Sequence, residues 1–172
     1  LLGLAFITEA EIARCEPWKE FLATLTEAKR VTKLVSPPSE VSAAPGGFWA
    51  AAERLPQFAA AFPGARLSPP IAAPAEFAAQ SWTCEDALVE IVRGRLQGLG
   101  PVSVAALAAS MALPVSDVET ALGRLAGEGF AMKGAFTPGT TQSEWCDRAL
   151  LARIPSRIGF SGPGSAATQT PS

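Results

Sequence analysis

Hydrophobic residues between positions 83 and 113 recur twice at helical spacing, with a break between the two runs. Thr83 with Asp86 three residues on is a capping-box pattern, and the apolar positions from Leu88 to Leu99 then follow the helical period. The glycines at 98 and 100 end this first helix, and Ser103 opens a second one that stops before Pro114.

The pattern continues with a third helix and then changes to short extended segments. Ser116 with Glu119 is another capping pair, and the predicted buried stripe is Val118, Ala121, Leu122 and Leu125. Residues 130–136, with Lys133-Gly134 as the turn, predict a small hairpin. Three helices followed directly by a hairpin is the order of a winged-helix module.

The first third of the chain repeats this order of elements. Thr8 with Glu11 predicts a capped short helix, and Pro17 suits the first turn of a second one whose apolar stripe is Trp18, Phe21, Leu22 and Leu25. Residues 31–35 and 48–52 then predict two strands, joined by a long Pro/Ala/Gly-rich wing loop. Residues 2–4 are interpreted as the tail of an opening helix further upstream.

The remaining segments complete the predicted domain organisation. The alanine-rich stretch 62–81 carries four prolines and predicts a semi-stiff linker rather than a helix. Thr141 with Glu144 predicts a final helix that runs to Ile154 and stops at Pro155. The expected fold class is therefore mainly α with small β-hairpins (α+β), built from tandem winged-helix modules. Their predicted bounds are a partial module at 1–61, the Pro/Ala-rich linker at 62–81, a second module with its following helix at 82–154, and a disordered or frameshifted tail at 155–172.

Composition and charge exclude several kinds of chemistry. Of the 172 residues, 48% are hydrophobic and 17% charged, and the net charge of −2 provides no overall basic field for nucleic acid or an anionic membrane. The absence of histidine excludes Ser-His-Asp, Cys-His and zinc–histidine sites. Three widely spaced cysteines form no disulfide framework, and no apolar run approaches the roughly 20 residues that cross a bilayer. We therefore expect reduced thiols, no membrane partner and a cytoplasmic location.

Four sequence motifs carry a family resemblance: residues 48–56 (FWAAAERLP), 91–102 (IVRGRLQGLGPV), 136–139 (FTPG) and 144–154 (EWCDRALLARI). In this order and spacing they resemble the C-terminal accessory region of Lhr-type (large helicase-related) DEAD/DEAH-box helicases. The resemblance implies a parent protein that is an ATP-dependent superfamily 2 DNA translocase linked with DNA repair. Its RecA-like motor domains would lie N-terminal to this region and bind ATP and Mg, while the winged-helix modules would grip the tracking strand.

The chain departs from the family pattern at its end and lacks every motor motif. The family continues with His-Arg and a long basic run where this chain reads Pro155-Ser156-Arg157, which is the basis of the frameshift hypothesis. No glycine precedes Lys-Ser or Lys-Thr as a P-loop requires, and a DEAH box needs histidine. We expect this fragment to bind no ATP or other cofactor. The Gln-x-Gln or Gln-x-Asp element of related winged-helix DNA glycosylases is also missing.

Candidate contacts with single-stranded DNA or a duplex junction are basic residues near the two wings, together with one aromatic ring. They are Lys29, Arg30 and Lys33 in the first module, and Arg93, Arg95, Lys133, Trp145, Arg148 and Arg153 in the second. The third helix of the second module is nearly neutral, which argues against sequence-specific reading of bases. The alternatives are ordinary solvated charges, packed aromatic rings (expected of Trp18 and the phenylalanines), and a winged-helix scaffold that docks protein without touching DNA.

Overall fold

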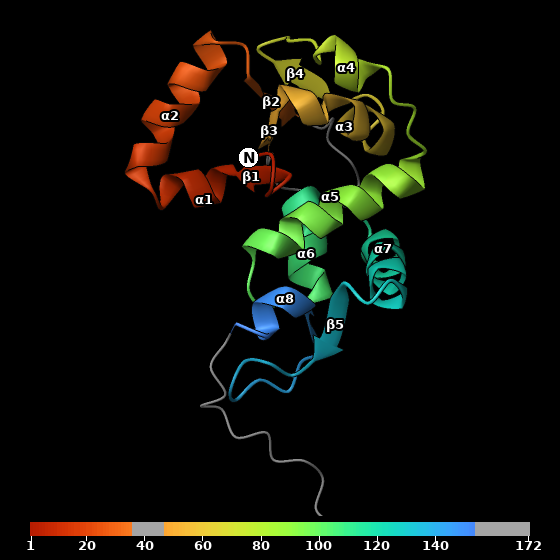
Figure 1. The fold of residues 1–172 in the computed structure, drawn as a ribbon. Helices are drawn as coiled ribbons and strands as arrows, with labels where there is room; N and C mark the ends of the chain where they lie inside the picture. Colours follow the sequence, from red (N-terminus) through yellow and green to blue (C-terminus); the bar gives the residue numbers. More distant parts are fainter. Residues whose placement is uncertain (36–46, 154–172) are drawn as a thin grey trace, which may run out of the picture.

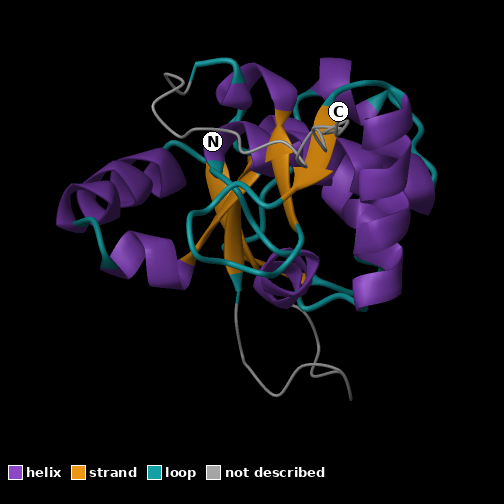
Figure 2. Ribbon diagram, turned by 90° about the horizontal axis from the view of Figure 1, so that it is seen from below, coloured by secondary structure: helices purple, strands orange, loops and turns teal. Residues whose placement is uncertain are grey.

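The computed structural model describes residues 1–35 and 47–153, so all but Gly47 of the predicted wing loop at 36–47, Ile154 and the predicted tail at 155–172 lie outside the described residues. The described chain combines helices with two small antiparallel sheets, which confirms the α+β class. In Figure 2 the strands gather in the middle of the molecule, with helices on both sides.

The first part of the chain forms a four-stranded sheet with the order β1-β3-β2-β4. Its elements are β1 (Phe6–Thr8), α1 (Glu9–Ala13), α2 (Glu16–Glu27), β2 (Val31–Val35), β3 (Phe48–Ala51), the 3-10 turn η1 (Ala52–Arg54), α3 (Leu55–Ala61) and β4 (Arg66–Ser68). The predicted capping box at the start of α1 is confirmed, because the Thr8 backbone N–H donates to Glu11 Oε2 at 2.8 Å and the Glu11 N–H donates to Thr8 Oγ1 at 3.3 Å.

The second part contains α4 (Ala75–Ala78), α5 (Cys84–Gly98), α6 (Val104–Met111), α7 (Val115–Gly127), β5 (Ala131–Gly134), β6 (Glu144–Asp147) and α8 (Arg148–Leu151). Thr83 and Ser103 cap α5 and α6 as predicted. The predicted capping box at Ser116 is wrong, because α7 begins at Val115 directly after Pro114. The Ser116 hydroxyl donates instead to Asp117 Oδ1 at 3.2 Å.

The region predicted as a tight hairpin and a final helix is a wider hairpin. Residues 144–147 form β6, which pairs with β5 across the loop 135–143, and α8 is a single turn rather than a helix from Thr141. Trp145 explains the difference, since its backbone N–H and C=O bond to Val102 at 2.8 and 2.9 Å on the side away from β5. With hydrogen-bond partners on both edges, these residues are held in a strand.

The two parts of the chain share one strand topology. In the first sheet, β3 lies between β1 and β2; in the second, β6 lies between Val102 and β5. The registers match residue for residue, because Lys33 faces Trp49 in the first sheet and Lys133 faces Trp145 in the second. We call the two parts unit one (residues 1–68) and unit two (residues 84–153).

The ends of α2 and α7 also match, at positions whose numbers differ by 100. Lys29 has φ +54° and Gly129 has φ +74°, so both helices end through a left-handed residue. The next backbone N–H donates back into the helix in both units, from Arg30 to Leu25 at 2.8 Å and from Phe130 to Leu125 at 2.9 Å. This correspondence makes residue-by-residue comparison of α2 with α7 meaningful.

Residues 62–81 differ from the predicted linker. They contain β4, which pairs with β2, and α4, a short helix in a stretch predicted to have none. Leu67, Ile71 and Ala73 pack against the core, and the Thr32 hydroxyl donates to the Pro69 carbonyl at 2.6 Å. Apolar side chains at these positions bind the segment to the sheet of unit one, so it covers a sheet edge instead of bridging open space.

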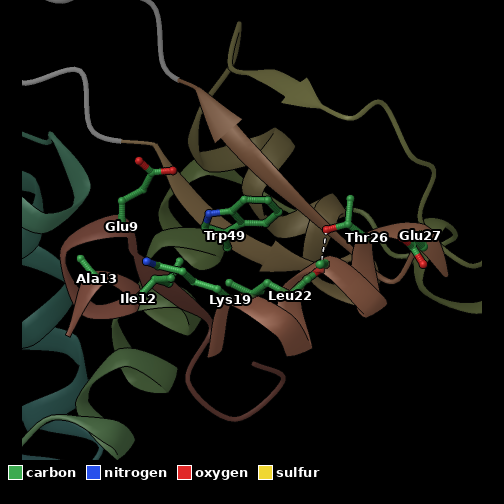
Figure 3. Close-up of a pocket in the computed structure, with 9 residues that line it drawn as sticks. Glu9, Ile12, Ala13, Lys19, Leu22, Thr26, Glu27 and Trp49 are labelled. Carbon is green, nitrogen blue, oxygen red and sulfur yellow. Dashed lines mark hydrogen bonds between the residues drawn. The ribbon is translucent and has the colours of Figure 1, made fainter. Parts of the chain in front are cut away.

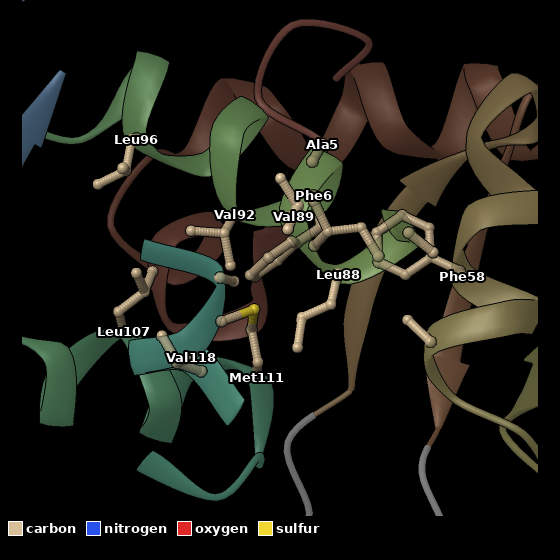
Figure 4. Close-up of a cluster of buried hydrophobic side chains, with 14 of the residues drawn as sticks. Ala5, Phe6, Phe58, Leu88, Val89, Val92, Leu96, Leu107, Met111 and Val118 are labelled. Atoms are coloured by element: carbon tan, nitrogen blue, oxygen red, sulfur yellow. The ribbon is translucent and has the colours of Figure 1, made fainter. Parts of the chain in front are cut away.

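The larger of two hydrophobic clusters in the described chain runs through both units (Figure 4), and the smaller one, in unit one, consists of Ile7, Ile12, Leu22 and Val31. Phe6 and Phe58 from unit one and Val92, Leu107 and Met111 from unit two belong to the same cluster of buried side chains. Helix α5 lies between them in Figure 1, with α3 and the first sheet on one side and α6 and α7 on the other. The predicted separation into two linked modules is therefore replaced by two packed units.

Glycine at position 94 allows α5 to approach the N-terminal segment closely. A Cβ there would lie 3.0 Å from Ala5 Cβ and 3.2 Å from the Gly3 carbonyl oxygen, which is tighter than ordinary contacts.

In the described part of the chain no single helix has the length and apolarity to cross a bilayer; α6 and α7 reach those limits only when joined across a bend of 116°.

Candidate nucleic-acid interface

Six of the eight predicted basic residues fall into two groups at opposite ends of the molecule, and Arg93 and Arg95 lie between them on α5. Lys29, Arg30 and Lys33 lie at the end of α2 and on β2, whereas Lys133, Arg148 and Arg153 lie on β5 and around α8. In Figure 1, β2 is near the top of the view, and β5 and α8 are near the bottom. The two predicted wings therefore do not form one continuous basic surface.

In unit one, carboxylates neutralise two of the three predicted cations. Arg30 is paired with Glu53, and Lys33 Nζ lies 2.5 Å from Glu9 Oε1. Lys29 is exposed and has no ion-pair partner among the described residues. Only this one residue of the first group keeps a free positive charge in the described chain.

Arg93 on α5 is a packing residue rather than a free cation. Its guanidinium bonds to Glu90 at 2.9 Å and to Glu128, and it lies 4.8 Å from the centre of the Phe130 ring. Burial alone would lower the pKa of Arg93, but the bonds to Glu128 and Glu90 outweigh it and raise the pKa. The group joins α5 to the end of α7.

Arg95, predicted as a nucleic-acid contact, is buried, with 4% of its surface exposed. Its Nη1 donates to the Phe6 carbonyl at 3.0 Å, its Nη2 lies 2.5 Å from Glu11 Oε1, and its guanidinium lies 4.6 Å from the centre of the Phe6 ring. The prediction is wrong because β1 and α1, some 85 residues earlier, cover this face of α5. Arg95 therefore joins unit two to unit one.

Glu11 completes this buried pair. Burial alone would raise the pKa of its carboxyl, but hydrogen bonds from the Thr8 backbone and the Arg95 guanidinium outweigh that effect and lower it. The carboxylate thus serves two purposes, capping α1 and neutralising Arg95.

The predicted packing of aromatic rings is confirmed for Phe6, Phe48, Phe58 and Phe62, which are buried, but it is wrong for two residues of α2. Trp145, a candidate for base stacking, is 8% exposed on β6, and Lys133 Nζ lies 5.6 Å from the centre of its ring. Trp18 and Phe21, predicted to be core, are 37% and 66% exposed. A ring as covered as that of Trp145 offers no free face on which a base could stack.

Three predicted cations remain exposed at the end of unit two. Lys133, Arg148 and Arg153 form no ion pair with any carboxylate in the described residues. Beside them, the loop 135–143 carries hydroxyl and amide side chains that can donate to phosphate oxygens, namely Thr140, Thr141, Gln142 and Ser143. Together they form the candidate interface, which we call the β5–β6 surface.

Glu144 fixes the shape of the loop beside this surface, a role that its sequence position did not suggest. Its Oε2 accepts from the backbone N–H groups of Phe136 and Thr137 at 2.9 and 2.8 Å, and its Oε1 accepts from the Thr137 hydroxyl at 2.8 Å. The Thr137 hydroxyl is the largest cause of the lowered pKa of this carboxyl, followed among the lowering causes by the two backbone donors. The predicted role of Glu144 at a helix start is therefore wrong.

We expect the variant Glu144→Gln to lose stability at neutral pH, because an amide oxygen replaces a charged acceptor of three hydrogen bonds. A carboxylate with a lowered folded pKa stabilises the protein above its unfolded pKa of about 4.3, and this contribution disappears as pH falls through the folded value. The difference in unfolding free energy between wild type and Glu144→Gln should therefore shrink on acidification. Urea titrations at several pH values measure it.

The matched control for this prediction is Glu119→Gln, at an exposed carboxylate on α7 that makes no side-chain hydrogen bond among the described residues. Its unfolding free energy should stay close to that of the wild type across the same pH range. A Glu144→Gln difference that is equally large at pH 7 and at pH 3 contradicts the anchoring role of Glu144.

The described residues offer no obvious site for a metal ion or a disulfide. No group of three or more Cys, Asp or Glu side chains in residues 1–35 and 47–153 is arranged to hold a metal. All three cysteines are free thiols. Burial is the main reason that the pKa of the Cys146 thiol is raised.

Comparison with known proteins identifies no relative: no family model matches the chain, and no curated protein matches it significantly. Functional arguments therefore depend on its residues and their geometry.

Proposed function

We propose that this chain is a non-catalytic accessory region that holds single-stranded DNA or a duplex junction through the β5–β6 surface. The two units are proposed to be winged-helix modules. Their shared topology supports this assignment: two helices precede a hairpin, and the last strand of the hairpin also pairs with a short segment that precedes the helices. In this proposal the hairpin of unit two is the wing that touches nucleic acid.

The observation that carries the proposal is the unequal neutralisation of the predicted cations. Arg30, Lys33, Arg93 and Arg95 all have carboxylate partners, whereas Lys133, Arg148 and Arg153 have none in the described chain and are exposed. Exposed, unpaired cations beside a loop of hydrogen-bond donors suit phosphate oxygens. Such contacts are independent of base sequence.

Helix α7 supports contact with the backbone rather than reading of bases. Of its outward residues, Glu119 is acidic, and Arg124 is held 2.9 Å from Asp86. A helix that reads base edges usually presents free Arg, Lys, Asn or Gln side chains. We therefore infer low sequence specificity.

The resemblance to Lhr-type helicases extends the proposal to the parent protein. Three of its motif segments fall on packed elements: residues 48–56 on β3 and the start of α3, residues 91–102 on α5 and Val102, and 144–154 on β6 and α8, apart from the undescribed Ile154. The parent would be an ATP-dependent DNA helicase or translocase with a role in DNA repair. Its RecA-like motor domains would bind ATP and Mg and move the strand that this region steadies.

Fluorescence anisotropy with a labelled single-stranded oligonucleotide tests the proposal. If three phosphates are contacted, the slope of log K against log[salt] is about −2, so affinity should fall roughly 20-fold between 50 and 200 mM salt. The triple variant Lys133→Gln/Arg148→Gln/Arg153→Gln should abolish most of this slope. The measurement uses the full chain in both cases.

The matched control removes three other cations, each of which is ion-paired: Lys19→Gln/Arg30→Gln/Arg124→Gln. It changes the net charge by the same amount and should leave most of the binding intact. Equal loss in both triple variants would show that only overall charge matters. If the folded chain binds no DNA at low salt, the docking-scaffold alternative is favoured, an alternative that the exposed apolar residues of α2 support.

A further inference from the structure

Helix α2 buries far less of its apolar face than its counterpart in unit two. The stripe of α7 is fully buried at Val118, Ala121, Leu122 and Leu125. At the equivalent positions of α2 only Leu22 is buried, while Trp18 is 37%, Phe21 66% and Leu25 36% exposed. We call Trp18, Phe21 and Leu25 the α2 stripe. Exposed large side chains in a contiguous row are typical of an interaction surface.

In unit two, α5 is the helix that covers the equivalent stripe. It packs along α7, and two ion pairs across the contact, Asp86 with Arg124 and Arg93 with Glu128, hold the helices together. In unit one, among the described residues, α2 packs mainly against α1 and β2. No described helix of unit one occupies the place that α5 takes in unit two.

On the side of Leu22 away from the α2 stripe there is open space, so α2 makes few packing contacts with the rest of unit one. A groove of about 620 Å³ lies between α1, α2 and the Trp49 ring on β3, as Figure 3 shows. Its lining is mostly apolar, and Glu9, Lys19 and Glu27 contribute its charges. One buried leucine between a groove and an exposed stripe leaves α2 with unused packing surface on both sides.

The charge of α2 indicates what kind of partner it accepts. Glu16, Glu20 and Glu27 are exposed on this helix, and its single cation, Lys19, is 2.9 Å from Glu16. Three glutamates and one lysine give the helix itself a net negative charge, which does not attract a phosphate backbone. The complementary partner has an apolar face to cover the α2 stripe and basic residues at its flanks.

We propose that the α2 stripe is the docking surface for an amphipathic helix from polypeptide outside residues 1–172, with an apolar face and basic flanks. This helix packs on α2 as α5 packs on α7. A second copy of α2 is a poor occupant, because antiparallel pairing that sets Trp18 against Leu25 also sets Glu16 against Glu27. The inference is independent of nucleic-acid binding, which concerns the opposite end of the molecule.

Isothermal titration with a synthetic amphipathic peptide tests this surface in the full chain. The probe is a helix of about 18 residues with Leu at the i, i+3, i+4 and i+7 positions and Lys elsewhere. We expect saturable binding, and about tenfold weaker binding to Phe21→Ser, because Phe21 is the most exposed residue of the stripe. Hydrogen exchange of the α2 amides should slow in the complex.

Two controls make the outcome decisive. Met132→Ser alters an exposed apolar side chain on β5, 44% exposed, and should bind the peptide as the wild type does. A peptide of the same composition in scrambled order should not bind. The proposal is overturned by an absence of binding, by equal binding to Phe21→Ser, by equal binding of the scrambled peptide, or by a dimer of the chain alone that Phe21→Ser dissociates.

Discussion

Replacing Phe58 with alanine should lower the free energy of unfolding by about 3–5 kcal/mol, the largest effect we expect from a single substitution. Phe58 is completely buried on α3. Its ring centre lies 5.4 Å from that of Phe48, 6.0 Å from that of Phe62 and 6.4 Å from that of Phe6, in an edge-to-face contact with the last of these. Deleting it opens a cavity at the centre of an aromatic cluster whose other rings cannot all close in.

Urea denaturation followed by far-UV circular dichroism measures this loss, and Phe21→Ala provides the control. Phe21 is 66% exposed, so its truncation should change the unfolding free energy by no more than about 0.5 kcal/mol. Because the chemical change is the same at both phenylalanines, the difference between the two losses of stability measures the effect of burial. A Phe58→Ala loss below about 1 kcal/mol would contradict the packing of α3 against both sheet and α5.

For the buried ion pair, removing the acid should cost more than removing the base. Glu11→Gln leaves the guanidinium of Arg95, whose side chain is 5% exposed, without a countercharge, and we expect a loss of about 3 kcal/mol. Arg95→Met replaces the cation with an apolar chain of similar length and leaves a carboxylate that is 26% exposed and still bonded to Thr8. Its loss should be smaller, about 1–2 kcal/mol.

A double-mutant cycle at pH 7 measures the coupling between the two residues. Glu11→Gln/Arg95→Met should be little worse than Arg95→Met alone, since the orphaned charge is gone. Because the Glu11 pKa is lowered in the folded state, the stabilisation it provides is present above its unfolded pKa and is lost as pH falls through the folded one. Strictly additive losses in the cycle would contradict a direct pair.

Local signals in the sequence predicted local structure well. The caps at Thr8, Thr83 and Ser103 were found because each depends on residues within one helical turn. The strand β6 was missed because the groups that hold Trp145 extended, on Val102 and β5, come from elsewhere in the chain. The spacing of apolar residues in this segment is compatible with a helix as well as with a strand.

Predictions of side-chain burial were wrong where burial depends on which distant element covers a helix face. The helical period correctly identified the apolar face of α2, but it contains no information on whether another helix packs there, and Phe21 is exposed. The opposite error was made for Arg95, which was predicted to be exposed but is buried, because the N-terminal segment that covers it lies far away in the sequence. For the candidate interface, Lys133, Arg148 and Arg153 were predictable as exposed cations, whereas the neutralisation of Lys33 by Glu9 required the fold.

The position of α5 has a consequence for how the protein melts. Its side chains belong to the larger cluster, which also holds the aromatic rings of unit one and the helices of unit two, so the main core of both units is exposed to water once α5 leaves. Thermal and chemical transitions should then follow a single cooperative step, with amide exchange in β3 and in α7 limited by the same global opening. A destabilising substitution in one unit should therefore also lower the stability of the other. A protease that cuts within residues 62–81 would release no fragment that stays folded on its own.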